Sequence, residues 1–424
     1  EARLVGVEVD GAQGMPWIAI GGRAGKSVLE SKDRVRSALT HSGYKFPLTR
    51  KVVNLSPAEL SKSGTQFDLG IALGLLLASG QIDLNAEDFM FAGELGLKGE
   101  VRAARGILPA LLSAKAAGIQ KFLIPFDNLK EASLVGDVDI FGVKYFKEAI
   151  DVIAGRRGKS EKAAMVFGNR KIWDYKHISG HAAAKRALMV AAAGGHHALM
   201  SGPPGSGKSL LARSFSSILP PPSNDELLEI LKIYSVTGRN IEKLNCERPF
   251  RSVHHGASEY SLIGGEFFPG EVSLAHNGVL FLDEFPEFSS TAIESLREPL
   301  EEKEICVRKG GRTLYYPCNF QLIAAMNPCP CGFYGDSKKH CVCPPYQVLR
   351  YKQKLSGPIL DRIDIQIEVP RISYDEISKK SSLDSAEMFE KVMAAREKQL
   401  RRGGINSLMT AEQIKSEKIS REAG

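Results

Sequence analysis

Gly202-Pro203-Pro204-Gly205-Ser206-Gly207-Lys208-Ser209 is the stretch that decides the fold. It fits Gly-x-x-x-x-Gly-Lys-Ser/Thr, in which backbone N–H groups surround a polyphosphate and the next helix points its positive end at it. The run 197–200 before it indicates a buried strand, and the run 210–215, starting at Leu210, indicates a helix. A chance glycine-rich turn is the alternative. We predict an ATP site in which Lys208 reaches the β- and γ-phosphates and Ser209 holds Mg²⁺.

A second apolar run, 278–282, ends in Asp283 and Glu284. A strand buried in a parallel sheet releases such side chains at its carboxyl edge, beside the phosphate loop. We therefore predict that Asp283 completes the Mg²⁺ shell and that Glu284 polarises the attacking water. A third apolar run, 321–326, delivers Asn327, which can sense the γ-phosphate and orient water. A simple turn cap before a proline is the alternative for Asn327.

Two close cysteine pairs, Cys329-Pro330-Cys331 and Cys341-Val342-Cys343, follow Asn327. Four thiolates can close a tetrahedral Zn²⁺ site and stabilise a loop that has little apolar material of its own. His340 is an alternative fourth ligand, and free thiols or an iron–sulfur cluster are alternatives to zinc. The other three cysteines stand apart from this cluster: Cys246, Cys306 and Cys318.

Residues 304–315 form two short strand-like runs around Gly310-Gly311, which predicts a β-hairpin. Its tip carries Arg308, Lys309 and Arg312. Three cations at a turn can follow a phosphate backbone without reading its sequence, which indicates a DNA-tracking role. A solvated turn is the alternative.

Length and composition indicate a soluble protein with several domains. The chain has 424 residues, of which 43% are hydrophobic and 25% charged, and its net charge is +7. This length exceeds a single core, and the basic excess permits nucleic-acid binding without requiring it. The longest apolar run, 69–80, is too short to span a bilayer, and the first residues lack the apolar region of a signal peptide. We therefore expect a cytoplasmic protein that has no membrane partner.

The pattern along the chain predicts four segments. Residues 1–153 form an α/β domain, 154–172 a charged linker, 173–371 the nucleotide-binding core, and 372–424 a mostly charged helical segment. The remaining expected elements are strands at 17–20, 51–55 and 121–125, and helices at 32–39, 67–79, 107–117 and 388–400.

The order of these features resembles the magnesium-chelatase-like AAA+ ATPase family, and in particular its branch from bacterial competence. The resemblance covers residues 1–370 and the first part of the helical segment after them. It implies an AAA+ core with an insert at 248–278, a pre-sensor-1 hairpin at 304–315 that projects into a pore, and the start of a helical lid after 371. The resemblance rests on the phosphate loop, His254-His255, Asp283-Glu284, the cysteine pairs and the stretch 356–362.

The resemblance also assigns roles to two further side chains. Asn327 takes the sensor-1 position, and Arg362 becomes an arginine finger that acts on the ATP of a neighbouring subunit, which requires a ring. A local ion pair of Arg362 with Asp361 or Asp364 is the alternative. The family's sensor-2 arginine has no assigned position in this chain.

Residues 1–153 resemble a Lon-protease-type (S5-type) domain through 93–101 and 111–118. Lon proteases carry a nucleophilic serine in a Pro-Ser-Ala-Gly turn and a lysine in a Gly-Gly-Leu-Lys turn. Here the first region reads Thr65-Gln66-Phe67-Asp68-Leu69-Gly70, and Leu108 stands where the lysine would be. Because Ser–Lys chemistry needs that amine, we predict an inactive domain that serves as a scaffold or contacts DNA.

By resemblance, the whole chain is expected to be an ATP-driven, homo-hexameric DNA helicase. It would use ATP and Mg²⁺, act on single-stranded and branched DNA, and promote branch migration of recombination intermediates in natural transformation. The main alternative is a chelatase-type motor that remodels a protein partner, although such ATPase subunits generally lack the Lon-like domain. A non-catalytic DNA scaffold conflicts with the presence of Lys208, Asp283 and Glu284, and an ATP-dependent protease conflicts with Leu108.

Overall fold

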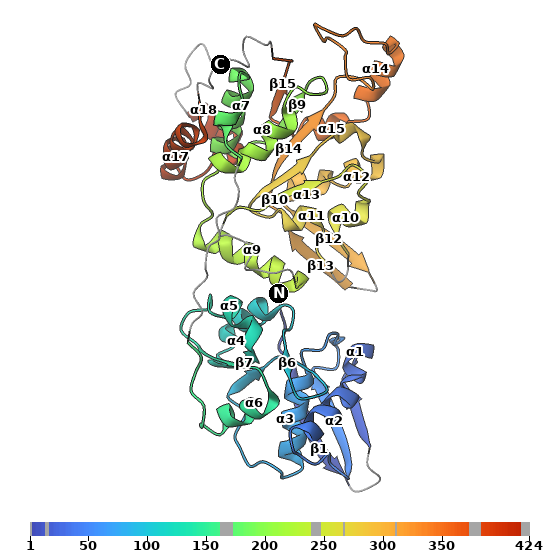
Figure 1. Cartoon of the computed structure of the whole chain (residues 1–424), viewed down its shortest axis with the longest axis vertical. Coiled ribbons are helices and arrows are strands. Elements are labelled where there is room, and N and C mark those ends of the chain that lie inside the picture. Colours follow the sequence, from blue (N-terminus) through green and yellow to red (C-terminus); the bar gives the residue numbers. More distant parts are fainter. Residues whose placement is uncertain are drawn as a thin grey trace. The chain divides into compact units, whose positions relative to one another are not determined.

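The computed structural model describes residues 2–12, 17–161, 173–238, 247–265, 268–309, 312–372 and 383–416. The chain divides into two compact units (Figure 1). The first consists of Glu1–Phe167 and Leu231–Lys243, and the second of Gly168–Ile230 and Leu244–Gly424. Both units mix helices with sheets that contain parallel strands, which confirms the predicted multidomain α/β class. Across the described ranges, every helix is too short or too polar to cross a membrane.

The first unit is built on two three-stranded sheets and a short ribbon within its described residues. One sheet has the order β1-β3-β2, and the other, which is parallel, has the order β4-β7-β8. The strands are β1 (Gly6–Ala12), β2 (Ile18–Gly21), β3 (Arg50–Ser56), β4 (Phe89–Phe91), β7 (Lys121–Pro125) and β8 (Asp139–Val143), with β5 (Glu94–Leu95) and β6 (Val101–Arg102) as the ribbon. The helices are α1 (Lys26–Leu29), α2 (Ser31–His41), α3 (Asp68–Ala78), α4 (Ile107–Ala116), α5 (Leu129–Ala132) and α6 (Phe146–Ile153).

Helix α3 lies at the centre of the first unit because nearly all of its side chains are apolar. Leu69, Ile71 and Leu75 are fully buried. Its first residue, Asp68, is buried as well and accepts hydrogen bonds from Arg34 of α2 at 2.6 and 2.9 Å. Burial raises the pKa of Asp68, although the paired guanidinium acts against this rise. A packed α2–α3 contact with its own ion pair is what an independent core requires.

Leu108, on α4 of the same unit, is fully buried. Its side chain is apolar, so this position offers no amine for a serine nucleophile. The Lon-like character of the domain and its inactivity remain predictions.

The first part of the predicted linker, 154–172, is attached to the first unit. The N–H of Ser160 donates to the Ile140 carbonyl at 2.8 Å, and the N–H of Gly142 donates to Ser160 Oγ at 2.9 Å. These bonds attach the chain as far as Ser160 to strand β8. Positions 162–172 lie outside the described residues.

The second unit contains a five-stranded parallel sheet in the order β10-β11-β14-β9-β15. Its strands are β9 (Ala198–Ser201), β10 (Phe250–Val253), β11 (Val279–Leu282), β14 (Gln321–Met326) and β15 (Ile365–Glu368). A separate antiparallel hairpin consists of β12 (Glu304–Lys309) and β13 (Arg312–Pro317). The helices include α7 (Ala182–Gly194), α8 (Lys208–Ser214), α10 (Glu259–Ile263), α11 (Glu271–Leu274), α12 (Ser290–Glu294), α13 (Arg297–Glu302), α14 (Pro345–Lys352), α15 (Gly357–Leu360), α17 (Ser385–Arg401) and α18 (Ala411–Ser416). Helix α9 (Asn224–Thr237) begins in this unit, and its residues from Leu231 onward group with the first unit.

Two hydrophobic clusters of the second unit share the strands of this sheet. Successive residues of a strand point to opposite faces, so Leu280 and Leu322 enter one cluster while Phe281 and Ile323 enter the other. This two-sided burial explains why the strands read as continuous apolar runs. Helix α17 joins the second cluster through Met388 and packs against α7.

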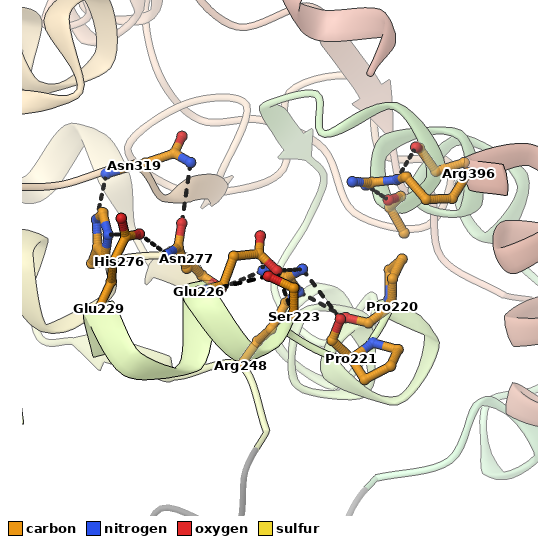
Figure 2. A network of polar contacts seen from close by, with 12 residues as sticks. Pro220, Pro221, Ser223, Glu226, Glu229, Arg248, His276, Asn277, Asn319 and Arg396 are labelled. Atoms are coloured by element: carbon orange, nitrogen blue, oxygen red, sulfur yellow. Dashed lines mark hydrogen bonds and ion pairs between the residues drawn. The ribbon is translucent and has the colours of Figure 1, made fainter. Parts of the chain in front are cut away.

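Arg248 is the centre of a polar network at the edge of this sheet where the strands begin (Figure 2). Its guanidinium donates to both carboxylate oxygens of Glu226, at 3.1 and 2.8 Å. It also donates to the carbonyl oxygens of Pro220 and Asn277, both at 2.7 Å. Burial opposes the ionisation of Glu226, but hydrogen bonds from Arg248 and from the Ser223 N–H lower its pKa overall.

We expect Arg248→Met to lower the free energy of unfolding by about 3 kcal/mol, the lower end for breaking a largely buried ion pair. Because the pKa of Glu226 is depressed, its contribution is present above the unfolded-state value and is lost as pH falls through the folded-state value. The difference in the free energy of unfolding between variant and wild type should therefore be smaller in acid. Urea unfolding at pH 7 and at pH 3.5 measures this. Arg401→Met, which breaks an exposed pair with Glu397, is the control and should cost less than about 0.5 kcal/mol. Equal midpoints for both variants at pH 7 would contradict the prediction.

Candidate functional site

The predicted phosphate loop joins the end of β9 to the first turn of α8, as the sequence indicated. Gly205 and Gly207 have φ values of +77° and +89°, a region that side chains other than glycine rarely adopt. A Cβ on Gly202 would lie 2.1 Å from the Val369 carbonyl oxygen, so only glycine fits there. Ser206 Oγ is buried and has no hydrogen-bond partner among the described residues, which suits a loop that receives an anion.

Four of the predicted side chains meet at the carboxyl edge of the sheet. Ser209 Oγ donates to Asp283 Oδ2 at 2.6 Å, and Lys208 Nζ donates to Asn327 Oδ1 at 3.3 Å. The sheet order explains this, because β14 lies between β9 and β11 and all three strands are parallel. Lys208 Nζ also donates to the Gly202 carbonyl at 2.6 Å, so the ammonium group sits inside the loop. The arrangement can bind a triphosphate and a divalent cation side by side.

Glu284 lies next to Asp283 in an unusual backbone conformation, with φ at +53°. Its N–H donates to Asp283 Oδ1 at 3.0 Å, and its Oε2 lies 2.9 Å from His255 Nδ1. The His255 ring in turn lies against that of His254, tilted by 34°, with centroids 4.1 Å apart. A non-glycine residue in the left-handed backbone conformation is strained, and it keeps this conformation only where surrounding contacts stabilise it.

Two histidines that the structure places at this site were assigned no role here by the sequence analysis. His255 stood out only as part of a family motif, and nothing in its local pattern connects it to Glu284, which lies on another segment. His181 precedes α7, and its Nε2 lies 3.6 Å from where a Cβ of Gly207 would be. A lone histidine before a helix carries no sequence signal for a nucleotide site, so only the fold could identify it.

Burial lowers the pKa of Lys208 to about 8, although Asp283 and Glu284 act in the opposite direction. A bound triphosphate favours the charged form, so ATP binding at pH 8 should take up about half a proton, and affinity should weaken as pH rises further. Calorimetric titration at pH 8 in buffers of different ionisation enthalpy measures this uptake. Lys208→Arg is the matched variant, because arginine stays charged and whatever binding remains should show no uptake. Buffer-independent heats for the wild type would contradict the assignment.

Arg362 lies at the opposite edge of the same sheet. It follows α15 and precedes β15, whose first residue pairs with the first residue of β9, whereas the phosphate loop follows the last residue of β9. Its Nη1 donates to the Pro358 carbonyl at 2.5 Å, and Nη2 pairs with the Glu301 carboxylate. Its Nε has no hydrogen-bond partner in the described part of the chain. Arg362 is therefore not brought to the phosphate loop of its own chain.

Arg362 does form an ion pair within its own chain, but its partner is neither Asp361 nor Asp364. Asp364 contacts His196 Nδ1 at 2.9 Å instead, and the acceptor for Arg362 is Glu301 on α13. A cavity of about 320 Å³ opens at this edge of the sheet. Its lining includes Arg362, Arg248 and Lys303.

The cationic hairpin forms as predicted. Strands β12 and β13 pair antiparallel with Arg308 opposite Thr313 and Lys309 opposite Arg312. The Arg308 side chain is exposed. The turn residues 310–311 lie outside the described residues. The pairing of β12 with β13 is therefore the evidence for the hairpin.

Cys329, Cys331, Cys341 and Cys343 come together, with their sulfur atoms all within 4.8 Å of one another. Cys329 Sγ lies 3.3 Å from Cys331 Sγ and 3.7 Å from Cys341 Sγ, and the latter two are 3.6 Å apart. Tetrahedral zinc with Zn–S bonds of about 2.3 Å needs sulfurs roughly 3.8 Å apart, so the group fits such an ion. The cluster does not include His340, which is exposed.

Two family models match the chain. Magnesium chelatase subunit ChlI matches residues 174–377, and a second model, subunit ChlI of Mg-chelatase, matches residues 7–128. Competence protein ComM of Haemophilus influenzae is 39% identical over 98% of this chain and 83% of its own length. The uncharacterized protein YifB of Salmonella typhimurium is 40% identical over 93% of this chain and 79% of its own length. The magnesium-chelatase 67 kDa subunit of Chlorobaculum parvum is 28% identical over 29% of this chain and 18% of its own length. The chain thus belongs to the magnesium-chelatase-like AAA+ family, in the group that includes ComM and the YifB proteins.

Proposed function

We propose that this chain is an ATP-driven motor that assembles as a homo-hexamer, moves on single-stranded and branched DNA, and promotes branch migration of recombination intermediates in natural transformation. The observation that carries the motor is the meeting of Lys208, Ser209, Asp283 and Asn327 at one edge of the sheet. Similarity to a protein named competence protein ComM supports the pathway.

Each side chain at the ATP site has a definite task in this proposal. Lys208 binds the β- and γ-phosphates, and the loop N–H groups hold the remaining oxygens. Ser209 and Asp283, already 2.6 Å apart, are placed to hold Mg²⁺, which neutralises charge on the phosphates. Glu284 accepts a proton from the attacking water, and Asn327 orients that water against the γ-phosphate.

The hairpin of β12 and β13 supports DNA as the partner. It brings Arg308, Lys309 and Arg312 to one end of a two-stranded ribbon. Cations near the turn of a hairpin suit the sequence-independent contacts that a translocating motor needs. Tyr315, on the same hairpin, is 60% exposed and offers a surface on which a base can stack.

The cysteine cluster supports a structural zinc ion. Four thiolates are a closed ligand set for Zn²⁺, and no position is left for water or substrate. Metal analysis of the purified protein should give about one zinc per chain.

A chelatase-type motor that remodels a protein partner is the second candidate. The match to a magnesium-chelatase subunit favours it, but that match covers 29% of this chain, whereas the match to ComM covers 98%. The likeness to the chelatase subunit thus reaches less than a third of the chain, whereas the likeness to ComM reaches nearly all of it. DNA remains the better-supported partner.

Neutralising the hairpin cations tests the DNA proposal. We expect Arg308→Ala/Lys309→Ala/Arg312→Ala to abolish ATP-dependent branch migration on a three-stranded substrate and to spare basal ATP hydrolysis. The reason is that the hairpin contacts DNA and not the nucleotide. The control is Lys391→Ala/Lys398→Ala/Arg401→Ala on α17, which removes three exposed cations elsewhere and should leave branch migration intact. Unaffected branch migration in the hairpin variant, or wild-type turnover that DNA does not stimulate, would refute the proposal.

A further inference from the structure

We propose that the metal ion held by Cys329, Cys331, Cys341 and Cys343 positions the phosphate loop and Asn327, so that metal occupancy controls ATP turnover. This inference rests on the proposed ATPase activity and on the zinc site. It adds a link between the two sites, because neither the nucleotide motif nor the cysteine spacing alone connects them.

The first link is direct contact between the cysteine loop and the phosphate loop. Gly332 follows the first cysteine pair and has φ at +84°. A Cβ placed on it would lie 2.6 Å from Cδ of Pro204 and 3.9 Å from Cγ of Asn327. The backbone of the cysteine loop therefore packs against the phosphate loop with no room for even a methyl group.

The second link is covalent continuity with Asn327 at both ends of the cysteine loop. Cys329 stands two residues after Asn327 and is fully buried. At the other end, Cys343 leads into α14, and Tyr351 of that helix interacts with the backbone of Asn327. The loop therefore leaves Asn327 and returns to it, with the metal ligands in between.

The third link ties the loop to the strand on the far side of β9. Arg371 follows β15, and its Nε donates to Oδ2 of Asp336 at 2.7 Å. The Asp336 side chain is only 1% exposed. The Arg371 guanidinium also lies over the Phe333 ring, 5.7 Å from its centroid. Val369, two residues before Arg371, donates to the Ser201 carbonyl at 2.7 Å, directly before the phosphate loop.

Apart from the contacts of Arg371 with Asp336 and Phe333, the loop has little besides a metal to keep this shape. Between the cysteine pairs its large apolar side chains are Phe333 and Tyr334, and Tyr334 is 52% exposed. Closing such a segment costs conformational entropy that these contacts offset only partly. Metal–thiolate bonds make up the difference, as in small zinc-dependent folds. Loss of the metal should therefore free the loop, and with it the surface that presses on Pro204 and positions Asn327.

Gly332→Ala separates this link from metal binding itself. It leaves all four cysteines in place but forces a Cβ against Pro204. We expect it to retain one metal per chain and to lower kcat for ATP at least 10-fold, with a smaller change in KM. Gly335→Ala is the matched control, because Gly335 is in the same loop at φ +78° and a Cβ there would meet nothing within 4 Å. It carries the same backbone strain and should keep kcat within about twofold.

Cobalt provides a readout that does not depend on turnover. Co²⁺ bound by four thiolates absorbs visible light, and its spectrum depends on the coordination geometry. Coupling between two sites is reciprocal, so if the metal affects the nucleotide site, nucleotide binding must also affect the metal site. We expect adenylyl imidodiphosphate with Mg²⁺ to change the visible spectrum of the Co²⁺-substituted wild type and of Gly335→Ala. The change should be lost in Gly332→Ala.

The outcomes separate the three ideas. A protein that binds no zinc and gives no thiolate–cobalt spectrum refutes the metal site. A wild type that shows the spectral change but hydrolyses no ATP refutes the ATPase and supports the link. Metal-depleted protein with full turnover, Gly332→Ala with wild-type kcat, or a cobalt spectrum indifferent to nucleotide overturns the link.

Discussion

Glu284→Gln is expected to keep ATP bound and to reduce turnover by about 100-fold or more, the usual scale for loss of a general base. Glutamine has the same size and can keep the contact with His255, but it cannot accept a proton from water. The groups proposed to hold the triphosphate and Mg²⁺ are untouched, namely Lys208, Ser209 and Asp283. Equilibrium binding of a fluorescent ATP analogue and steady-state hydrolysis, measured on the same sample, check both halves of the prediction.

A neighbouring glutamate supplies the control. Glu287 lies three residues on and forms a half-exposed ion pair with Lys354, 3.3 Å away. Glu287→Gln makes the same chemical change in the same segment and should alter turnover by less than about twofold. Normal turnover in Glu284→Gln would remove Glu284 from the mechanism. Loss of nucleotide binding in that variant would assign it to holding the ligand.

The geometry of the candidate ATP site could be predicted from the sequence because its signals are local. The phosphate loop determines its own conformation through glycines at 205 and 207, which both adopt positive φ. Asp283 and Asn327 follow apolar runs, and parallel strands in one sheet bring their carboxyl ends to a common edge. Strand and helix predictions succeeded for the same reason. The helix expected at 388–400, for example, is found as α17 (Ser385–Arg401), and the strand expected at 51–55 as β3.

Contacts between distant segments could not be predicted in the same way. The pairing of His255 with Glu284 depends on β10 lying beside β11, and the pairing of Arg362 with Glu301 joins segments 61 residues apart. Neither pair has a spacing that a helix or strand imposes. The grouping of Leu231–Lys243 with the first unit could not be predicted either. It depends on contacts between distant segments, such as the bond from the Gly106 N–H to the Ser235 carbonyl at 2.9 Å, and these contacts leave no periodic pattern in the sequence.

Arg362→Ala is expected to lower ATP turnover by about 1,000-fold while nucleotide binding persists, because fingers supplied in trans contribute roughly 10³–10⁵ to kcat. The reason is its place in the sheet. It lies at the edge where the strands begin, and Lys208 lies at the edge where they end, so the proposed finger would serve the nucleotide of another subunit. The side chain of its partner Glu301 is exposed, so the ion pair can break and free Arg362. Glu301→Gln should therefore keep turnover, whereas Arg362→Lys, which retains charge without the planar fork, should recover only part of it.

Mixing two inactive variants decides between action in trans and a structural role. Arg362→Ala subunits can bind ATP but lack the finger, and Lys208→Ala subunits keep Arg362 but bind no productive ATP. In a mixed ring, an Arg362→Ala subunit that is followed by a Lys208→Ala subunit has a complete site, made of Lys208 from one chain and Arg362 from the next. An equal mixture should recover about a quarter of wild-type turnover, since one interface in four has this order when subunits assemble at random. A mixture as inactive as its components would place Arg362 in cis or in a structural role, and the ring-based mechanism would lose its main support.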